Sequence, residues 1–410
     1  MADRRLQATW LNDGGLPRLL AVLDANGEET RAVGGAVRNA LLGMPVGEID
    51  VATTATPDEV VKRVTAAGFK AVPTGIEHGT VTVVIDSVPF EVTTLRRDVE
   101  TDGRHAKVAF GRDWKTDAER RDFTINALSV SRDGTIHDYV GGLADLEKRK
   151  VRFIGEPKKR IEEDYLRVLR FFRFHAAYGE GALDAEGLHA CIAARGRLDQ
   201  LSRERVRMEM VKLLIAPRAA PVLEAMADAG LLGTLLAGVP NGVHFAAMAA
   251  IEHALSLPPN AMRRLAALAV MVVEDAERLG EKLRLSKAEQ AQLASMGQAW
   301  WRRIVPAGDK LAKPWLYRLG PEQFIDRVLL AWARCGAPAD DAKWRELATL
   351  PQRWTAPIFP IKAADLMARG VDKGPKLGIA LEAAENAWIA AGFPSAKSDL
   401  DAIAEAAAKV

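Results

Sequence analysis

The sequence predicts an α+β protein in which a small mixed sheet with helices precedes an all-helical neck, body and tail. β-branched runs and glycine turns are concentrated in the first 150 residues. From about Lys158 onward, Ala, Leu, Arg and Glu dominate and apolar residues recur at helical spacing. At roughly 150 residues per domain, the chain is also too long for one core. We therefore expect a head (1–150), a neck (151–220) and a body with a tail (221–410).

The elements of the head follow from local patterns taken in chain order. Gly34-Gly35 predicts a tight turn between a strand and a short helix that Gly43 stops. Thr56 and Pro57 predict the N-cap and first position of a later helix. The turn residues 86–89 separate two β-rich runs and predict a hairpin. The expected elements are strand Arg31–Val33, helix Ala36–Leu42, strand Ile49–Ala52, the helix from Thr56, and hairpin strands Val81–Ile85 and Phe90–Thr94.

Beyond the head, Pro and Gly clusters at 257–260, 306–308 and 351–360 separate the predicted helices. The segment 95–110 is polar and without periodicity, so we expect a flexible loop there. We expect the tryptophans of the C-terminal half, from Trp300 to Trp354, to belong to the core rather than to stack on bases.

Composition and cysteine content exclude several classes of protein. The chain is 49% hydrophobic and 27% charged, which is typical of a soluble globular protein and excludes disorder and collagen. Two cysteines, Cys191 and Cys335, are too few for a disulfide framework and favour a reducing compartment. No stretch approaches the roughly 20 apolar residues of a membrane span, and the first residues lack the apolar segment of a secretory signal. We expect a cytoplasmic protein without membrane association.

The charge of the chain is unevenly distributed. The formal net charge is only +2, but residues 148–218 hold 17 Lys or Arg against 10 Asp or Glu. The rest of the chain is therefore net acidic. A basic middle segment favours a polyanionic partner such as nucleic acid. The cluster alone is weak evidence, because solvated helix faces are often rich in Arg and Lys.

Two features of the head favour a metal-assisted reaction on a phosphate. A Gly34-Gly35 turn before a helix lets backbone amides approach a triphosphate, although such a pair can also be a plain turn. Glu48 and Asp50 are two apart on a predicted strand and so share a face. Glu91 on the hairpin can join them. Three carboxylates on neighbouring strands suit Mg²⁺, and two such ions would serve in-line phosphoryl transfer.

A set of ordered motifs carries a resemblance to a known family. The strings VGGAVRNALLG…EID, FEVTTLR, RRDFTINAL, DYVGGLADL and EEDYLRVLRFFRF occur in that order between about Arg31 and Lys212. Together they resemble the class II tRNA nucleotidyltransferase and poly(A) polymerase family, whose head belongs to the polymerase-β-like nucleotidyltransferases. The resemblance implies that Glu48, Asp50 and Glu91 are the catalytic, metal-binding carboxylates.

The resemblance also implies which residues bind the nucleotide. In this family's pattern Gly34, Gly35 and Arg38 form the glycine-rich element. Arg120, Arg121 and Asp122 match the motif that contacts ribose and triphosphate, with the Asp accepting from a sugar hydroxyl. A helix-start charge cluster would explain those three residues without a ligand. Asp138 and Gly141 to Asp145 match a hinge-like motif, although a plain turn explains them nearly as well.

The base-reading motif of the family matches Glu163, Asp164 and Arg167. On a helix, Asp164 and Arg167 would share one face, and an intrahelical salt bridge is the simpler explanation of that spacing. An Asp accepts from an amino group and a guanidinium donates to a ring nitrogen. Cytosine and adenine both offer that combination, whereas uracil and guanine do not. One Asp–Arg pair can therefore accept C and A while leaving unpaired groups against U and G.

Further matches concern RNA. The segment 202–209, with Arg205 and Arg207, resembles a neck helix whose arginines either contact RNA or orient Asp164 and Arg167. The segment 95–110 resembles the family's flexible loop, which is implicated in switching from C to A addition. A Gly-Pro-Lys turn containing Lys376 resembles the tail element and could hold an RNA phosphate, although a simple helical connection explains it as well.

The chain departs from the family pattern at two positions. Glu48 stands where Asp is usual, so the metal-binding oxygens shift by one methylene. Asn39 stands where Asp is common, so a hydrogen-bond acceptor remains but the charge is lost. Neither change removes a ligand type, and we expect activity to be retained. The resemblance implies Mg-dependent addition of CCA to tRNA from CTP and ATP; the alternatives are a poly(A) polymerase, a CC-only or A-only enzyme, or a catalytically decayed tRNA-binding protein.

Overall fold

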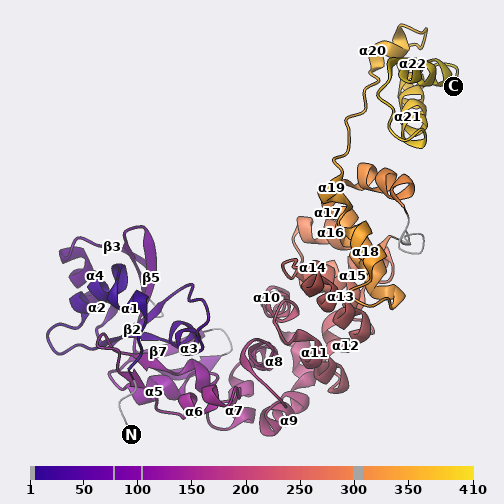
Figure 1. Ribbon diagram of the computed structural model, residues 1–410. Coiled ribbons are helices and arrows are strands. Elements are labelled where there is room, and N and C mark those ends of the chain that lie inside the picture. Colours follow the sequence, from indigo (N-terminus) through magenta and orange to yellow (C-terminus); the bar gives the residue numbers. More distant parts are fainter. Residues whose placement is uncertain (1–4, 77–78, 103–104, 299–307) are drawn as a thin grey trace. The chain divides into compact units, whose positions relative to one another are not determined.

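The computed structural model describes residues 5–76, 79–102, 105–298 and 308–410 (Figure 1). The chain forms two compact units, residues 1–235 and 236–410. The predicted head and neck both fall in the first unit. Among the described residues, no helix is long and apolar enough to cross a membrane.

A seven-stranded mixed sheet is the centre of the first unit. Its strand order is β3-β4-β5-β2-β1-β8-β9, and β6 and β7 form a separate two-stranded sheet. The strands are β1 (Thr30–Val33), β2 (Asp50–Thr53), β3 (Lys70–Gly75), β4 (Thr80–Ile85), β5 (Val88–Thr94), β6 (Arg96–Asp102), β7 (His105–Phe110), β8 (Ser129–Val130) and β9 (Ile136–His137). The parallel pairing of β2 with β5 inside an otherwise antiparallel sheet brings segments 40 residues apart side by side.

Helices surround this sheet and continue beyond it. The helices of the first unit are α1 (Thr9–Asn12), α2 (Gly15–Leu23), α3 (Gly35–Leu41), α4 (Pro57–Ala66), α5 (Trp114–Glu119), the 3-10 helix η2 (Thr124–Asn126), α6 (Gly142–Glu147), α7 (Pro157–Glu163), α8 (Leu166–Tyr178), α9 (Ala185–Ala193), the 3-10 helix η3 (Arg195–Gln200), α10 (Arg203–Leu214), α11 (Ala219–Asp228) and α12 (Leu231–Leu236), whose last residue belongs to the second unit. α2 and α4 pack on each other and against the strands. Phe123, Phe153 and Phe171 are fully buried and in mutual ring contact, so the residues after α5 and the helix α8 share one core.

Helices are the only regular secondary structure among the described residues of the second unit. It contains α13 (Gly242–Ala254), α14 (Ala261–Ala269), α15 (Val273–Leu283), α16 (Lys287–Gly297), α17 (Asp309–Cys335), α18 (Ala342–Ala348), α19 (Leu350–Arg353), α20 (Ala363–Met367), α21 (Pro375–Ala390) and α22 (Lys397–Ala407). The last three helices have their own small core around Leu366, Leu377 and Ala384. A segment without regular structure, residues 355–362, connects them to α19 (Figure 1).

Most of the expected elements are present. The all-helical C-terminal part is confirmed, and so is the N-cap at Thr56, whose side chain accepts a hydrogen bond from the Glu59 amide. The hairpin β4–β5 turns at Asp86 and Ser87, both with positive φ. Trp332 and Trp344 are buried and stacked, as expected for core residues, whereas Trp300 and Trp301 lie outside the described residues.

Two segments have more regular structure than we expected. Residues 96–102 and 105–110, within the expected flexible loop, pair as the antiparallel strands β6 and β7. The Asp102-Gly103 pair between two runs that each contain a valine is a hairpin signal that we did not use. In the segment that matches the hinge-like motif, Asp138 accepts hydrogen bonds from four successive amides, 140 to 143, which is the plain turn that we had left open; a hinge role for this segment stays a prediction. A Cβ on Gly142 would lie 2.2 Å from the Thr124 carbonyl oxygen, so this backbone is tightly packed.

The two cysteines are both unpaired. Cys191 is buried in α9, and burial raises the pKa of its thiol far above the ordinary value. Cys335 is exposed at the last residue of α17. The two thiols therefore differ strongly in reactivity, since the thiolate is the reactive form.

Candidate active site

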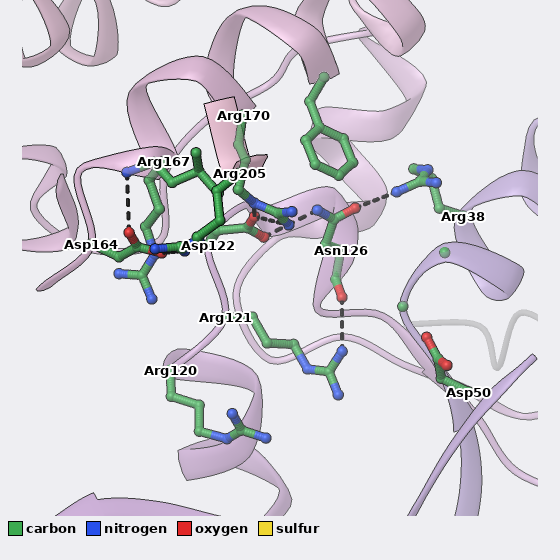
Figure 2. Close-up of a pocket in the computed structure, with 14 residues that line it drawn as sticks. Arg38, Asp50, Arg120, Arg121, Asp122, Asn126, Asp164, Arg167, Arg170 and Arg205 are labelled. Atoms are coloured by element: carbon green, nitrogen blue, oxygen red, sulfur yellow. Dashed lines mark hydrogen bonds and ion pairs between the residues drawn. The ribbon is translucent and has the colours of Figure 1, made fainter. Parts of the chain in front are cut away.

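A cavity of about 500 Å³ in the first unit collects most of the predicted nucleotide-binding residues (Figure 2). Its walls come from the β1–α3 turn, the start of β2, the end of α5, η2, α8 and α10. Six of its lining residues are arginines, namely Arg38, Arg120, Arg121, Arg167, Arg170 and Arg205, and three are aspartates, Asp50, Asp122 and Asp164. The excess of positive charge suits a polyanion such as a triphosphate.

The glycine turn forms one wall of this cavity. Gly34 has φ of +69°, a conformation that residues with a side chain rarely adopt. A Cβ at this position would lie 3.2 Å from Nη1 of Arg121. The amide of Gly34 donates to the Leu128 carbonyl oxygen at 2.9 Å, which fixes the turn to the strand beside it. The backbone conformation therefore favours glycine here, and an added Cβ would also require the end of the Arg121 side chain to shift by a few tenths of an ångström.

Asp50 lies beside the glycine turn. In the sheet register it is paired with Val33 of β1 on one side and with Glu91 of β5 on the other. Residues paired across neighbouring strands share a face, so the two acids lie side by side. Asp50 and Glu91 are therefore placed so that both carboxylates can contribute to one acidic site next to Gly34.

Glu48 departs from the predicted arrangement. It precedes β2 instead of belonging to it, because β1 ends at Val33 and offers no partner to residues before Asp50. Of the three predicted acids, only Asp50 lines the cavity. Among the described residues, no three His, Cys, Asp or Glu side chains are grouped closely enough to form a metal centre. The structure thus brings Asp50 and Glu91 together by register but does not assemble the predicted trio.

The electrostatics of Asp50 nevertheless suit a cation. Although its side chain is open to solvent, partial desolvation raises the pKa of Asp50; the Arg121 charge acts to lower it and the Glu48 charge acts to raise it. A carboxylate that is disfavoured as a bare anion and repelled by a second carboxylate gains from a bound positive ion. The oxygen-only donors are those that hard divalent cations prefer. The residues present therefore fit a divalent metal.

Arg38 is buried behind the glycine turn. It donates to Asn39 Oδ1 from Nε at 3.1 Å and from Nη2 at 2.9 Å, and to the Tyr178 hydroxyl at 2.7 Å. Its guanidinium also lies 3.9 Å from the centre of the Tyr178 ring. Burial lowers the pKa of Arg38, and Tyr178 acts against this. Asn39 is therefore a neutral hydrogen-bond acceptor for this arginine.

Arg120 and Arg121 follow α5 and are held by Asp117, a residue that we did not predict. Asp117 is buried and accepts from Arg120 at 2.8 Å and from Arg121 at 3.3 Å. The two arginines lie at the end of a helix, so a helix-start charge cluster does not explain them. The signal for Asp117 was its spacing of three and four residues from the arginines.

Asp122 is the most enclosed of the three aspartates that line the cavity. Its Oδ1 accepts from the Phe123 amide at 2.8 Å and from Asn126 Nδ2 at 3.1 Å. Its Oδ2 accepts from Nε and Nη2 of Arg170 at 2.8 and 2.5 Å. Burial acts to raise the pKa of Asp122, but Arg170 and the hydrogen bonds hold it below the ordinary value. Asp122 is therefore ionised at neutral pH.

Of the predicted base-reading residues, Asp164 and Arg167 line the cavity, but not from one helix, whereas Glu163 does not line it and pairs with Arg167. The chain breaks at Asp164 and Tyr165, between α7 and α8. Asp164 Oδ1 accepts from the amide of Leu166, the first residue of α8, at 3.1 Å, and Tyr165 is the N-cap of that helix. Our expectation of Asp164 and Arg167 on one helix face was wrong, because Asp164 has an extended backbone that ends α7. Arg167 does not pair with Asp164 but donates to the Glu163 carboxylate and to the Arg160 carbonyl oxygen.

The predicted RNA-binding arginines have different environments. Arg205 lines the cavity and donates to Asp164 Oδ2 at 2.6 Å, which favours the role of orienting Asp164. Arg207, on the same helix, does not line the cavity. Lys376 is exposed in the first turn of α21, directly after Gly374 and Pro375.

Several residues of the cavity were missed by sequence reasoning. Leu166, Arg170 and Phe174 follow one another at intervals of four on α8 and form one stripe with Arg167. Asn126 lies in the same ordered motif as Asp122. The α8 residues lie in the string EEDYLRVLRFFRF, and Asn126 lies in RRDFTINAL. The signals that could have found them are the helical spacing along α8 and the short 3-10 turn after Asp122.

Two family models match the chain. The model described as the poly(A) polymerase head domain matches residues 30–152. The model described as the probable RNA- and SrmB-binding site of polymerase A matches residues 182–241. The first match covers β1 to the residues after α6, which include Asp50, Glu91 and Asp122.

Known proteins are similar over almost the whole chain. The mitochondrial CCA tRNA nucleotidyltransferase 1 of Danio rerio is 35% identical, over 94% of this chain and 89% of that protein. A CCA-adding enzyme of Limosilactobacillus fermentum is 32% identical, over 88% of this chain and 89% of that protein. Among solved structures, the Bacillus stearothermophilus CCA-adding enzyme in complex with CTP has a TM-score of 0.71 and 29% identity, and covers 91% of each chain.

Proposed function

Because the chain belongs to the family of class II CCA-adding tRNA nucleotidyltransferases and poly(A) polymerases, we propose that it adds C, C and A to the 3′ ends of tRNA from CTP and ATP. The main support is the arginine-rich cavity beside Asp50 and the glycine turn. It occurs in a chain that is similar over most of its length to CCA-adding enzymes. No nucleic-acid template is used, because the protein itself selects the base.

The residues of the cavity account for the chemistry of transfer. Arg120, Arg121 and Arg38 neutralise the triphosphate, with the Gly34-Gly35 turn close to it. The terminal 3′-hydroxyl of the tRNA attacks the α-phosphorus, the bond to the β,γ-pyrophosphate breaks, and pyrophosphate leaves. Asp50 and Glu91, with Glu48 near them in sequence, would hold divalent cations, which we take to be two Mg²⁺; when bound, these would supply activation of the attacking hydroxyl and neutralisation of the leaving oxygen. Asp50 holds its place through its strand register.

Asp164 and Arg167 are the proposed selectors of the base. Described residues give Asp164 two hydrogen bonds, from the Leu166 amide and from Arg205. A carboxylate offers about four acceptor positions, so Asp164 retains capacity for an exocyclic amino group. Arg205 keeps the carboxylate oriented, and Glu163 does the same for Arg167. Uracil or guanine would place an acceptor against an acceptor, which is costly in a closed site.

The helical second unit and the neck are proposed to bind tRNA mainly through its backbone and shape. The tail helix α21 presents Lys376 and the amides of its first turn at the surface. Affinity should therefore fall as salt is added, as for other proteins that neutralise phosphates.

The decisive experiment is incorporation of labelled nucleotides into tRNA that lacks its 3′ CCA. We expect CMP to be added twice and AMP once, with no growth on UTP or GTP. Asp50→Asn should reduce incorporation by more than about 100-fold, because loss of a direct metal ligand costs more than the 10- to 100-fold typical of outer-shell residues. Arg63→Ala, which removes a paired arginine of α4 away from the cavity, is the control.

The possible outcomes distinguish the alternatives. Growth of a homopolymer from ATP alone on arbitrary RNA would favour a poly(A) polymerase. Addition that stops after CC, or that needs CC already present, would indicate a partial enzyme. If Asp50→Asn leaves incorporation unchanged, the metal assignment is wrong, and tRNA binding without any incorporation would indicate a catalytically decayed protein.

A further inference from the structure

Arg38 reaches the cavity from a buried position beside the glycine turn. It is 6% exposed, and a Cβ on Gly35 would lie 3.5 Å from its Nη2. Its side chain donates to the side-chain oxygens of Asn39 and Tyr178, and to Oδ1 of Asn126 (Figure 2). All three acceptors are neutral, and among the described residues no carboxylate forms an ion pair with Arg38. Because a guanidinium stays protonated, its charge is left for a ligand.

Tyr178 makes two different contacts with this guanidinium. Its hydroxyl accepts from Nη2 of Arg38 at 2.7 Å, and the centre of its ring lies 3.9 Å from Cζ of Arg38. The face of an aromatic ring attracts a cation, and more strongly where water is partly excluded. Tyr178 is half-buried at the last residue of α8. It therefore attracts and orients the cation without cancelling its charge.

Phe174, one turn earlier on α8, is a second ring near this guanidinium. Its centre lies 5.3 Å from Cζ of Arg38 and 5.8 Å from the centre of the Tyr178 ring. The Phe174 ring also lies 4.0 Å from Cζ of Arg173 and 5.2 Å from Cζ of Arg170. Its contact with Arg38 is longer than that of Tyr178 and has no hydrogen bond. The contact that fixes the orientation of Arg38 on α8 is therefore the one with Tyr178.

We propose that Tyr178 is a positioning residue for the triphosphate, because it holds the Arg38 guanidinium beside the glycine turn in the orientation that meets the phosphates. This inference rests on the proposed function and deepens it. Arg38 lines the cavity, but Tyr178 is not among the described residues that do so, so it acts through Arg38. Because phosphates are common to all nucleotides, loss of Tyr178 weakens the binding of CTP, of ATP and of a bare polyphosphate by the same factor.

The test measures equilibrium binding of tripolyphosphate, CTP and ATP to the full-length protein with Mg²⁺, and steady-state kinetics on trimmed tRNA. Tyr178→Leu removes ring and hydroxyl, and we expect it to raise all three Kd values roughly 10-fold. Tyr178→Phe keeps the ring and should raise them roughly threefold. The value of kcat should stay within about threefold of wild type, because uniform binding is what is lost. The preference for CTP over UTP should not change, because Arg167 on the same helix keeps its position.

A double-mutant cycle shows whether Tyr178 acts through Arg38. Arg38→Ala should weaken tripolyphosphate binding at least as much as Tyr178→Leu does. Adding Tyr178→Leu to Arg38→Ala should then change the Kd by less than about twofold, because the interaction is already lost. Tyr317→Phe is the matched control, since it removes a hydroxyl that donates to Glu385 Oε1 at 2.5 Å in the second unit. It should leave tripolyphosphate binding unchanged.

Three results would overturn the proposal. An unchanged Kd for tripolyphosphate in Tyr178→Leu would exclude a role in phosphate binding. Multiplicative losses in the double variant would show that Tyr178 and Arg38 act separately. A fall in the preference for CTP over UTP would show that Tyr178 acts on the position of the whole helix α8. Should Tyr178→Leu fold poorly, Tyr178→Phe is combined with Arg38→Ala in the same cycle.

Failure of the proposed function is distinguishable from failure of this inference. If the wild-type protein adds no nucleotide to trimmed tRNA, the proposed function is wrong. Binding of tripolyphosphate and CTP needs no catalysis, so the same variants then decide the inference by their Kd values alone.

Discussion

Gly34 combines a backbone conformation that favours glycine with a close approach of the Arg121 side chain. Its φ of +69° disfavours any side chain, and a Cβ would press on Arg121. We expect Gly34→Ala to lower the free energy of unfolding by about 1–3 kcal/mol through backbone strain. It should also raise KM for CTP, because the guanidinium of Arg121, which we propose binds the triphosphate, would be displaced by the added Cβ. Chemical denaturation and steady-state kinetics measure the two effects.

Gly43 provides the matched control. Its φ is +65°, but a Cβ there would meet nothing within 4 Å. Gly43→Ala should cost a similar amount of stability without changing KM. Equal changes in KM for both variants would mean that strain alone, and not the contact with Arg121, explains the effect.

The raised pKa of Asp50 predicts that Asp50→Asn increases the stability of the protein by an amount that depends on pH. Its pKa is raised in the folded protein, first by desolvation. Folding therefore disfavours the ionised carboxylate, which lowers the free energy of unfolding. This cost is absent below the unfolded pKa of about 3.9 and complete above the folded pKa. With chelator present, Asp50→Asn should therefore melt at a higher temperature than wild type at pH 7, and the gain should shrink as the pH falls towards 4.

Glu59 should behave in the opposite way. Its pKa is lowered by its hydrogen bond with Arg63, so its contribution to stability is present above the unfolded pKa and lost in acid. Glu59→Gln should therefore lower the melting temperature at pH 7. A gain with Glu59→Gln, or a loss with Asp50→Asn, would contradict these pKa directions.

Sequence reasoning identified the residues of the site better than their contacts. Asp50, Asp122, Asp164 and the motif arginines were found because their types and order are distinctive. Their partners Asp117 and Arg170 were not found, because their contacts with the site residues depend on how α5 and α8 pack. The only trace of such contacts in the sequence is the helical spacing of the residues.

At the scale of elements, α8 carries the proposed selection of the base. Arg167→Ala removes a donor to the base edge, so discrimination against UTP should fall by roughly 10- to 100-fold, equivalent to about 1–3 kcal/mol for a mismatched polar group. Competition between CTP and UTP in the incorporation assay measures the ratio. Arg160→Ala, which removes another partner of Glu163 outside the cavity, should leave the ratio unchanged; a comparable loss there would shift the assignment to Glu163.

The prediction of elements succeeded where local signals decide and failed where capping or pairing decides. The helix after Thr56 and the β4–β5 hairpin were found from capping and turn residues. The break at Asp164 was missed because an aspartate within a helical pattern can either continue the helix or mark its end, and the sequence does not distinguish the two. The β6–β7 hairpin was missed because its polar strands lack an apolar alternation.

At the scale of the whole molecule, basic residues are concentrated in the segment 148–218, while the remaining chain is net acidic. This distribution favours approach of a polyanion to the cavity and the neck over non-specific adhesion elsewhere. The tail adds a separate, exposed basic position in Lys376.

Lys376 can be tested by the salt dependence of tRNA binding. If it contacts a phosphate, Lys376→Ala should weaken tRNA binding and reduce the slope of log K against log salt by about one. CTP binding should not change. Lys397→Ala, an exposed lysine at the start of α22, is the control. An unchanged slope for Lys376→Ala would remove this residue from the RNA-binding surface.

The contrast between Cys191 and Cys335 has a practical consequence. Because one thiol is enclosed and poorly ionised while the other is open to solvent, a maleimide dye should attach to a single position in the unaltered protein. That position is the last residue of α17, in the unit that we propose contacts tRNA. Fluorescence from a label there would report substrate-dependent rearrangement through each round of addition without an engineered cysteine.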